Sequence, residues 1–386
     1  MAQYLLNGPE HLESLYGVLA AGMVPVNTNY RYAGDEVVSL WHDADVEAVV
    51  FDVSFAAQAQ AVRPRVPAVR LWLAAGSGEV PDWAVPYEGA ACGSRREAGP
   101  WGRSGEDLLL VYTGGTTGRP KGVMWRQDDL FRVLSRTAFG YPEEEGIAGL
   151  RACLQAEDRL PPPRQLPGPP LMHGTGLFTA LDAHPARWDL SSLWLIVSSG
   201  AMWSAEVKAG LQRHLPRLTM VDTVGSSEAV GIASSRSDRE RGAVGRSGFL
   251  LGPDTKVIDD EGRSVAPGSG QRGWLAFGGR GPIGYYKDPE KTAGTWRVID
   301  GRRWIVPGDV AEVGSDGAIH LLGRGSAVIS TGGEKVFAEE VEEAVKLHPA
   351  VSDAVVVGVP AASVRLSSRW SRRGDRLPAS GSWWSG

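Results

Sequence analysis

The alternation of amphipathic helices with short apolar segments is the feature that most constrains the fold of this chain. Apolar residues recur at helical spacing over residues 11–21, and the expected inner face of this helix is Leu12, Leu15, Tyr16 and Leu19. Residues 24–26 follow as an extended piece. The next helix is expected to be capped by Asp35 and to bury Val37, Val38 and Trp41. A buried strand over residues 46–51 follows, so the pattern predicts a parallel α/β fold.

Later apolar runs first extend this pattern and then change it. Strands are predicted over residues 108–112, 193–198 and 218–222, with ligand-binding groups just beyond their carboxyl ends. From residue 243 short β-like pieces alternate with Gly and Pro turns, at residues 255–258, 273–277, 304–306 and 318–322. A smaller β-rich subdomain is the simplest interpretation. One more helix, burying Val341, Ala344 and Val345, and a strand over 354–357 are expected after it.

Composition excludes several classes of protein. The 386 residues exceed the size at which a single core usually stops growing, which predicts two domains. The net charge of -5 provides no basic field for nucleic acid or for an anionic membrane. Cys92 and Cys153 are too few for a disulfide framework or a zinc cluster. The first residues lack the pattern of a secretory leader and no run of about 18 apolar residues occurs, so a cytoplasmic chain without a transmembrane segment is expected.

A loop of glycines and threonines with one lysine follows the apolar run 108–111. Glycines let successive backbone N–H groups turn toward an anion, hydroxyl groups add donors, and the lysine adds a compact positive charge. The loop predicts a site for the phosphates of a nucleotide triphosphate, formed by Thr113, Gly114, Gly115, Thr116, Thr117, Gly118 and Lys121. An ordinary P-loop NTPase is not expected, because Lys121 precedes Gly122 rather than Ser or Thr. A surface loop without a ligand is the alternative for this stretch alone.

Residue for residue, the stretch 112–123 resembles the signature loop of the adenylate-forming superfamily, which includes acyl-CoA synthetases, peptide-synthetase adenylation domains and firefly luciferase. The family usually has Ser where Gly114 stands. Further clusters resemble the family's motifs in the right chain order, at residues 170–174, 198–202, 222–228 and 307–309. Residues 323–326 and 331–337 resemble the hinge and the first hairpin of the family's mobile C-terminal domain.

The resemblance implies that most of these clusters contact the nucleotide. Asp309 would accept hydrogen bonds from both ribose hydroxyls. The other residues implied to lie against the nucleotide are Gly200, Ala201, Gly225, Ser226, Ser227 and Arg324. Two departures from the family pattern, Pro307 for the usual Thr and Ser326 at the hinge for the usual Asp or Lys, leave Asp309 in place.

The resemblance also implies which residues act in catalysis and hold Mg²⁺. The implied catalytic residues are Lys121, Thr116, Glu228 and His173, and the implied metal ligands are Glu228 and Thr116. An acid suits this role because Mg²⁺ prefers hard oxygen ligands. Each of two residues, taken alone, has an alternative interpretation: His173 as a histidine of the core, and Glu228 as a solvated acid on the surface. Lys335 belongs to the hairpin, whereas the family's catalytic lysine lies near the end of the C-terminal domain.

The implied reaction has two halves. A carboxylate attacks the α-phosphate of ATP to give an acyl-adenylate and pyrophosphate, and the thiol of coenzyme A then displaces AMP. The sequence around residues 122–126, 170–176 and 199–204 is most similar to actinobacterial fatty-acid or steroid-side-chain CoA ligases. A hydrophobic small-molecule carboxylate is therefore the expected substrate, with ATP, Mg²⁺ and coenzyme A as the other participants and no nucleic-acid partner.

The resemblance also sets the domain boundaries. Residues 1–323 correspond to the AMP-binding N-terminal domain and residues 324–360 to the start of a truncated α+β C-terminal domain. Relatives would have a further strand and helix before Tyr4 and several dozen residues near 181–182. The tail 361–386 is rich in Ser, Arg and Trp and is expected to be disordered. Codons read one nucleotide later can spell the family's Arg-Phe-Gly continuation there, so we hypothesise a frameshift near residue 361, which sequencing of the gene tests.

Three functions fit these observations. The first is an ATP-dependent acyl-CoA ligase. The second is a nucleotide-binding remnant of such a ligase with impaired catalysis, since the resemblance places the catalytic lysine beyond the altered tail. The third is an adenylation module that acts with a phosphopantetheine carrier protein. An ATP–pyrophosphate exchange assay separates the first two, and the genes next to this one test the third.

Overall fold

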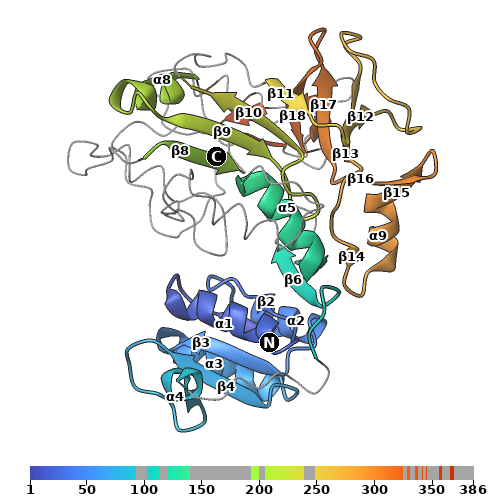
Figure 1. Cartoon of the computed structure of the whole chain (residues 1–386). Helices are drawn as coiled ribbons and strands as arrows, with labels where there is room; N and C mark the ends of the chain where they lie inside the picture. Colours follow the sequence, from blue (N-terminus) through green and yellow to red (C-terminus); the bar gives the residue numbers. More distant parts are fainter. Residues whose placement is uncertain are drawn as a thin grey trace. The chain divides into compact units, whose positions relative to one another are not determined.

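The computed structural model describes residues 1–92, 102–113, 120–139, 193–199, 205–238 and 248–324, and then residues 328–330, 335–337, 341, 345, 356–358 and 366–368. The chain divides into two compact units. The first comprises Met1–Thr255 and Ala276–Pro307, and the second comprises Lys256–Leu275 and Gly308–Gly386. Figure 1 labels their helices and strands.

The first unit opens with a sheet whose strands run parallel at its centre. Strand β1 (Ala2–Tyr4) pairs in parallel with β2 (Val26–Asn27) and with β3 (Ala48–Asp52). Strand β4 (Leu71–Ala75) continues the parallel pairing from β3, and β5 (Val85–Pro86) from β4. The parallel α/β class predicted from the alternating pattern is confirmed.

The other edge of this sheet turns antiparallel. Strand β6 (Leu108–Thr113) is parallel to β2, but β7 (Lys121–Arg126) returns antiparallel to β6. Strand β14 (Gly284–Tyr285), from a distant part of the chain, pairs antiparallel with β7. The full strand order is β14-β7-β6-β2-β1-β3-β4-β5.

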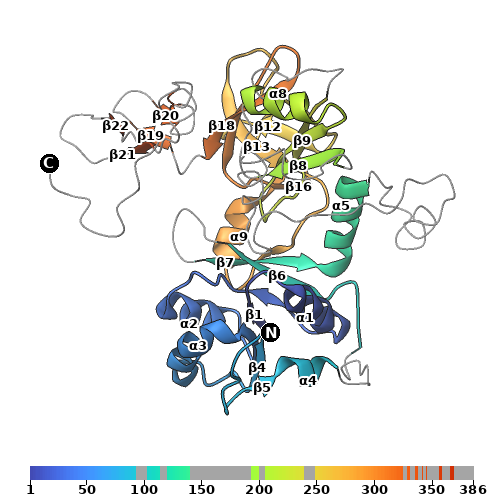
Figure 2. The same ribbon diagram turned by 90° about the vertical axis from the view of Figure 1, so that its left-hand side faces the viewer.

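Helices cover both faces of the parallel strands because successive side chains of a strand point to opposite faces. The face that includes Phe51 packs against α2 (Gly34–Asp43) and α3 (Ala56–Val62). The face that includes Val50 packs against Tyr87, the first residue of α4 (Tyr87–Ala91). Figure 2 shows α2 and α3 on one side of β1 and helix α1 on the other. Two short 3₁₀ turns lie at Val53–Phe55 and Arg63–Arg65.

Aromatic rings fill the space between this sheet and α2. Trp41 and Trp72 lie 5.7 Å apart between ring centroids, and Phe51 and Trp83 stack at 5.4 Å. Tyr4 meets the edge of Trp41 at 6.0 Å. Ring pairs of this kind add about 0.5–1.5 kcal/mol each beyond the burial of their area. This cluster is the apolar core of the sheet.

Helix α1 (Pro9–Ala20) forms where the spacing predicts, but only two residues of the predicted inner face, Leu15 and Leu19, are half-buried. Its buried residues are His11, Ser14 and Val18, whereas Leu12 is 42% and Tyr16 is 66% exposed. The cause lies in the sheet. The buried amide of Gln3 in β1 donates to the His11 carbonyl oxygen and to Ser14 Oγ, both at 2.8 Å, and these two bonds fix the helix rotation.

The predicted cap of α2 is also wrong. Ala33 is the N-cap residue, and Glu36 Oε2 accepts a hydrogen bond from the Ala33 N–H at 2.8 Å. Asp35 lies in the first turn, where its carboxylate pairs with Arg65 at 2.7 Å. The predicted inner face of Val37, Val38 and Trp41 is confirmed.

The rest of the first unit contains a second group of strands. Strand β8 (Leu195–Ser199) runs parallel to β9 (Thr219–Val224), and α8 (Ala205–His214) lies between them in the chain. Strand β10 (Ala233–Ser237) is antiparallel to β9, and β11 (Gly248–Leu251) is antiparallel to β10.

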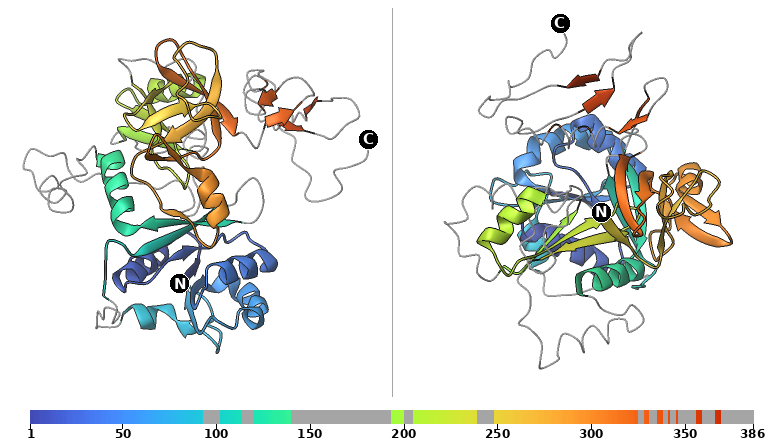
Figure 3. Two further views of the ribbon diagram at one scale, coloured as in Figure 1. Left: turned by 90° about the vertical axis from the view of Figure 1, so that its right-hand side faces the viewer. Right: turned by 90° about the horizontal axis from the view of Figure 1, so that it is seen from above.

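Helices α5 and α9 link these strands to the first sheet. Helix α5 (Gln127–Phe139) follows β7 directly, and α9 (Pro289–Thr295) follows β14 after a short turn. Figure 3 shows the orange α9 close to the blue-green end of β7. The β15–β16 hairpin (Trp296–Ile299 and Arg302–Ile305) comes next.

The second unit is β-rich, as the change in sequence texture predicts. It contains most of β12 (Thr255–Ile258) and β13 (Arg272–Phe277), and all of β17 (Asp309–Val313) and β18 (Ala318–Arg324). Strands β12, β13 and β18 begin within one residue of the predicted positions, whereas no strand was predicted at β17. Strand β17 pairs with both β13 and β18.

Two short hairpins follow in the second unit. Strands β19 (Val328–Ser330) and β20 (Lys335–Phe337) form one, and β21 (Val356–Gly358) and β22 (Leu366–Ser368) form the other. Strand β22 lies in the tail that was expected to be disordered. In the part of the chain described, no helix is both long and apolar enough to cross a membrane.

Candidate functional site

The predicted phosphate loop is the connection between two hydrogen-bonded strands. Thr113 ends β6 and Lys121 begins β7, and the two are cross-strand partners. Residues 114–119 lie outside the described residues, so the structure places the two ends of the loop and not Gly114, Gly115, Thr116, Thr117 or Gly118. Because β6 is parallel to β2, Thr113 stands at the carboxyl end of a parallel strand, as expected.

The base of the loop is packed tightly. A Cβ atom at Gly122 would lie 2.8 Å from the ring of Tyr112, so this position accepts only glycine without a shift of the ring. The Tyr112 hydroxyl donates to Asp43 Oδ2 at 2.5 Å. Burial, and then this hydrogen bond, raise the pKa of Tyr112 well above its usual value. The side chain of Asn27 pairs with both the N–H and the carbonyl of Tyr112, which fixes the strand beneath the loop.

Lys121 forms an ion pair within the protein. Its Nζ lies 2.6 Å from Asp288 Oδ2, and the two side chains are 36% and 19% exposed. Asp288 is also the N-cap of α9, where its Oδ1 accepts from the Lys291 N–H at 3.0 Å. The bond from Lys121, and next the bond from Lys291 N–H, lower the pKa of the Asp288 carboxyl.

Glu228 lies in a compact turn that follows β9. The N–H of Ser226 donates to the Ala229 carbonyl at 2.9 Å, and the Glu228 N–H to Ser226 Oγ at 3.2 Å. A Cβ atom at Gly225 would lie 3.0 Å from the Ala229 carbonyl oxygen, which explains a glycine there. The Ser227 carbonyl accepts from Trp125 Nε1 in β7 at 2.9 Å, so this turn is tied to the strand that Lys121 begins.

One short segment contacts both charged side chains of the predicted site. The Tyr285 hydroxyl donates to Glu228 Oε1 at 2.7 Å, and three residues later Asp288 pairs with Lys121. The structure therefore brings Lys121 and Glu228 to the same segment, although they are far apart in sequence.

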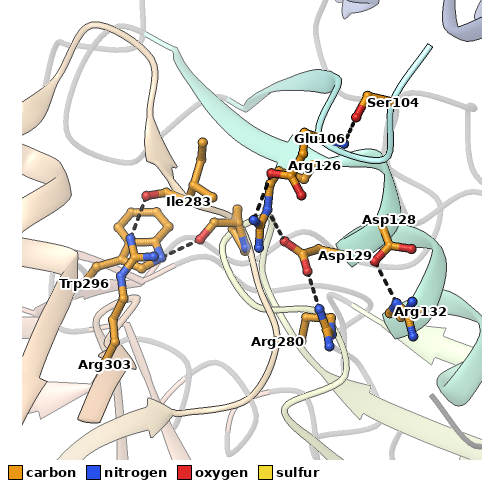
Figure 4. A network of polar contacts seen from close by, with 11 residues as sticks. Ser104, Glu106, Arg126, Asp128, Asp129, Arg132, Arg280, Ile283, Trp296 and Arg303 are labelled. Atoms are coloured by element: carbon orange, nitrogen blue, oxygen red, sulfur yellow. Dashed lines mark hydrogen bonds and ion pairs between the residues drawn. The ribbon is translucent and has the colours of Figure 1, made fainter. Parts of the chain in front are cut away.

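A buried carboxylate fixes the chain that leads into this segment (Figure 4). Asp129 is 2% exposed and accepts from Arg126 Nε at 2.6 Å and from Arg280 Nη1 at 2.7 Å. Arg303 donates to the Ile283 carbonyl at 2.6 Å, just before β14. The bond to Asp129 raises the pKa of Arg126, while burial, and then the charge of Arg126, lower that of Arg303. Because the Asp129 carboxylate is buried and both arginines pair with it, loss of either partner would be costly, and the two pairs fix Arg126 and Arg280 relative to α5.

Asp309 and Arg324 belong to the second unit. Asp309 opens β17, Arg324 ends β18, and the two are cross-strand partners. The two residues implied to contact the ribose and the nucleotide are thus neighbours within that unit.

Other predicted residues lie outside the described ranges. His173, Gly200 and Ala201 belong to this group, as do the five loop residues named above.

A buried ion pair occurs in the same motif as Glu228. Lys208 Nζ in α8 lies 2.5 Å from Asp222 Oδ2 in β9, and the side chains are only 4% and 6% exposed. Neither carboxylate oxygen of Asp222 has a hydrogen-bond partner of good geometry among the described residues. The pair is therefore held by charge attraction at a buried position, where removal of one partner is costly.

A cavity of about 790 Å³ lies elsewhere in the first unit. It is found beyond the carboxyl ends of β3 and β4, and Asp52, Glu79 and Glu88 are among its lining residues. None of the predicted site residues that the structure describes is among its lining residues.

Sequence reasoning missed Tyr285 and Asp288. The run Asp288-Pro289-Glu290 does signal a helix start, with an N-cap residue followed by Pro. No signal within the sequence, however, connects this helix start with Lys121.

Comparisons with known proteins agree with the fold and the motifs. The family model for AMP-binding enzymes matches residues 1–160. A medium/long-chain-fatty-acid–CoA/3-oxocholest-4-en-26-oate–CoA ligase from Mycolicibacterium smegmatis is 36% identical over 419 residues, which cover 92% of this chain and 74% of the relative. A 3-oxocholest-4-en-26-oate–CoA ligase from Rhodococcus rhodochrous is 33% identical, with the same shares covered.

Solved structures show the same fold. The anthranilate CoA ligase AuaEII in complex with anthranoyl-AMP superposes with a TM-score of 0.71 at 19% identity, covering 98% of this chain and 78% of that one. ATP-bound MatB from Rhodopseudomonas palustris has a TM-score of 0.70 at 22% identity, covering 98% and 79%. The chain belongs to the AMP-binding, adenylate-forming enzyme family.

Within that family the curated relatives are acyl-CoA ligases, and by family the chain is an acid–thiol ligase. Its co-substrates and metal are those of the family, namely ATP, Mg²⁺ and coenzyme A. Within the ranges that the structure describes, no cluster of three or more His, Cys, Asp or Glu residues is placed to hold a metal. Glu228 still fits Mg²⁺, because this ion is commonly bound by one or two carboxylates together with substrate phosphates.

Proposed function

We propose that the chain is an ATP-dependent acyl-CoA ligase that activates a hydrophobic carboxylate, a medium- or long-chain fatty acid or a steroid-derived acid, through its acyl-adenylate. The names of the relatives from Mycolicibacterium smegmatis and Rhodococcus rhodochrous support this substrate class. The products of the first half are the acyl-adenylate and pyrophosphate, and those of the second are the CoA thioester and AMP.

One observation supports the site assignment most strongly. Lys121 begins β7 and Glu228 lies in the turn after β9, yet the segment from Tyr285 to Asp288 contacts both. A positive and a negative side chain next to one segment suit the phosphates of ATP and the metal that accompanies them.

The proposed roles follow from electrostatics. Two unit negative charges 4 Å apart repel by about 4 kcal/mol at an effective dielectric constant near 20, and a carboxylate must approach a triphosphate that carries several. Lys121 and the loop N–H groups from residue 113 to 118 would offset this repulsion, and Glu228 with Thr116 would hold Mg²⁺. Preorganised donors of this type contribute roughly 2.7–4 kcal/mol each to the transition state.

The remaining predicted residues complete the proposed nucleotide site. Asp309 would accept from the ribose hydroxyls and His173 would border the acyl group. The residues proposed to lie against the rest of the adenylate are Gly200, Ala201, Gly225, Ser226, Ser227 and Arg324.

A nucleotide-binding protein with impaired ligase activity is the second candidate. The alignment with the Mycolicibacterium smegmatis relative extends over 419 residues, whereas this chain has 386, so the alignment contains positions that the chain lacks. The proposed loss of several dozen residues near 181–182 would account for such positions, and the domain boundaries at 323 and 360 stay proposals.

The experiment measures ATP–pyrophosphate exchange and CoA thioester formation with a series of fatty acids of increasing chain length and with a steroid carboxylic acid. Exchange and thioester formation with a hydrophobic acid are expected. ATP binding without exchange for any acid would favour the second candidate. Exchange without transfer to free coenzyme A would favour a carrier-protein acceptor.

A further inference from the structure

The segment from Tyr285 to Asp288, here called the 285–288 turn, attaches to the predicted site at both of its ends. The Tyr285 hydroxyl donates to Glu228 at 2.7 Å, and the Asp288 carboxylate pairs with Lys121 at 2.6 Å. Both charged side chains of the proposed nucleotide site therefore have internal partners in this structure.

The middle of the turn is anchored elsewhere. Tyr286 donates its hydroxyl to Asp45 at 2.7 Å, and the Lys287 ammonium also pairs with Asp45 at 2.7 Å. Lys287 has a φ of 54°, a left-handed conformation that non-glycine residues seldom adopt. Residues held in this region are maintained by the surrounding contacts, so the turn is a defined structure.

The backbone of the same segment is hydrogen-bonded to β7. The Ile283 N–H donates to the Met124 carbonyl at 2.9 Å, and the Tyr286 N–H donates to the Gly122 carbonyl at 2.8 Å. The turn is thus fixed to the strand that Lys121 begins, and Asp288 is held close to the lysine rather than meeting it by chance.

The Asp288 carboxylate resembles a phosphate in what it offers Lys121. It presents an anionic oxygen to the ammonium group at hydrogen-bond distance, and its other oxygen is engaged by the first turn of α9. A lysine with three donors on a flexible stem can exchange one anionic oxygen for another at little cost. A phosphate oxygen of ATP would therefore compete with Asp288 for the same ammonium group.

We propose that Asp288 is a positioning residue that occupies Lys121 in the nucleotide-free protein and is replaced by a phosphate oxygen when ATP binds. The inference rests on the proposed function, because it assumes that Lys121 contacts the phosphates. Asp288 therefore competes with ATP for Lys121 and lowers the affinity for ATP, because its negative charge stays next to the phosphates.

The test is the dissociation constant of Mg²⁺-ATP for wild type and for Asp288→Asn, measured by titration calorimetry on the full chain. Asparagine is as good an N-cap as aspartate, so this change removes the charge and keeps the start of α9. We expect Asp288→Asn to bind ATP about fivefold more tightly, the upper range for a partly exposed ion pair. A merely structural role would weaken binding instead. Asp288→Ser, which also caps helices, provides a second variant if the first does not fold.

Asp45→Asn is the matched control, since it removes the same charge from the other ion pair of the same turn. Its affinity for ATP should stay within about twofold of wild type. The inference would be overturned if both Asp288 variants bound ATP as tightly as wild type or more weakly. It would also be overturned if the Asp45→Asn control gained as much ATP affinity as the Asp288 variants. Either result would leave the proposed function intact. A wild-type chain that binds no ATP would instead overturn the proposed function and the inference with it.

Discussion

The aromatic core of the first sheet and the β6–β7–β14 edge of the same sheet are held together by different forces. In the core, Trp41, Phe51 and Trp72 are almost fully buried and contact one another through their rings. At the edge, Lys121 and Glu228 are placed by an ion pair and a hydrogen bond from the 285–288 turn. The core should therefore determine stability, and the edge should determine activity.

The first prediction tests whether the aromatic core determines stability. Phe51→Ala removes a fully buried ring and leaves a cavity between Trp72 and Trp83, which should lower the free energy of unfolding by about 3–5 kcal/mol. Urea denaturation measures this loss. Val298→Ala, at a 74% exposed position, is the control and should change stability by less than about 0.5 kcal/mol. A loss below about 1 kcal/mol for Phe51→Ala would contradict the assignment of the core.

The second prediction concerns the buried ion pair of Lys208 and Asp222. Lys208→Met leaves the Asp222 carboxylate buried without its partner and should cost about 3 kcal/mol or more. The double variant Lys208→Met/Asp222→Asn removes both charges and should recover part of that stability. Denaturation curves of the three proteins measure the difference. Equal stability of the single and double variants would show that the loss does not come from the unpaired Asp222 charge.

The third prediction tests the edge. Glu228→Gln removes a charge but keeps an oxygen that can accept from Tyr285, so the fold should be preserved. If Glu228 holds Mg²⁺, the turnover of ATP–pyrophosphate exchange should fall about 10²–10³-fold. Tyr285→Phe, which removes the hydrogen bond and keeps the Glu228 charge, is the matched variant and should have a smaller effect. Full activity of Glu228→Gln would exclude the proposed metal ligand.

The fourth prediction concerns the buried His11 of helix α1, and its expected effect on stability is the smallest. Burial lowers the pKa of His11, so the folded state disfavours its protonated form. The unfolded chain then takes up a proton below the ordinary histidine pKa of about 6.5, and stability should fall as the pH drops through that value.

Melting temperatures at pH 7.5 and 5.5 measure this effect. His11→Gln should show a smaller difference between the two than wild type. His214→Gln, at an exposed position, should leave that difference unchanged. An identical pH dependence in His11→Gln and wild type would remove His11 as the cause.

The elements that sequence reasoning placed well are those whose signal is local. The strands at 46–51 and 108–112 and the inner face of α2 follow from apolar periodicity, and the structure confirms them. The rotation of α1 could not be predicted, because it depends on hydrogen bonds from Gln3 in a neighbouring strand. Asp35 was chosen as a cap by residue type, but Glu36 reaches back to Ala33 and moves the start of the helix.

The candidate site divides in the same way. Lys121, Glu228 and Asp309 are predicted because each lies in a short motif that resembles a family pattern. Tyr285 and Asp288 were not found, because their importance arises only from contacts with residues far away in the sequence.

The sequence by itself determined the alternating α/β framework, the membership in a family and the chemical character of the loop, since residue type, spacing and motif are local properties. Only the tertiary structure decided which side chains meet. Strand β14 aligns with β7 through backbone hydrogen bonds, and this pairing sets Asp288 against Lys121 and Tyr285 against Glu228. The physical reason is that a contact between distant residues depends on the packing of the whole sheet, which no short segment encodes.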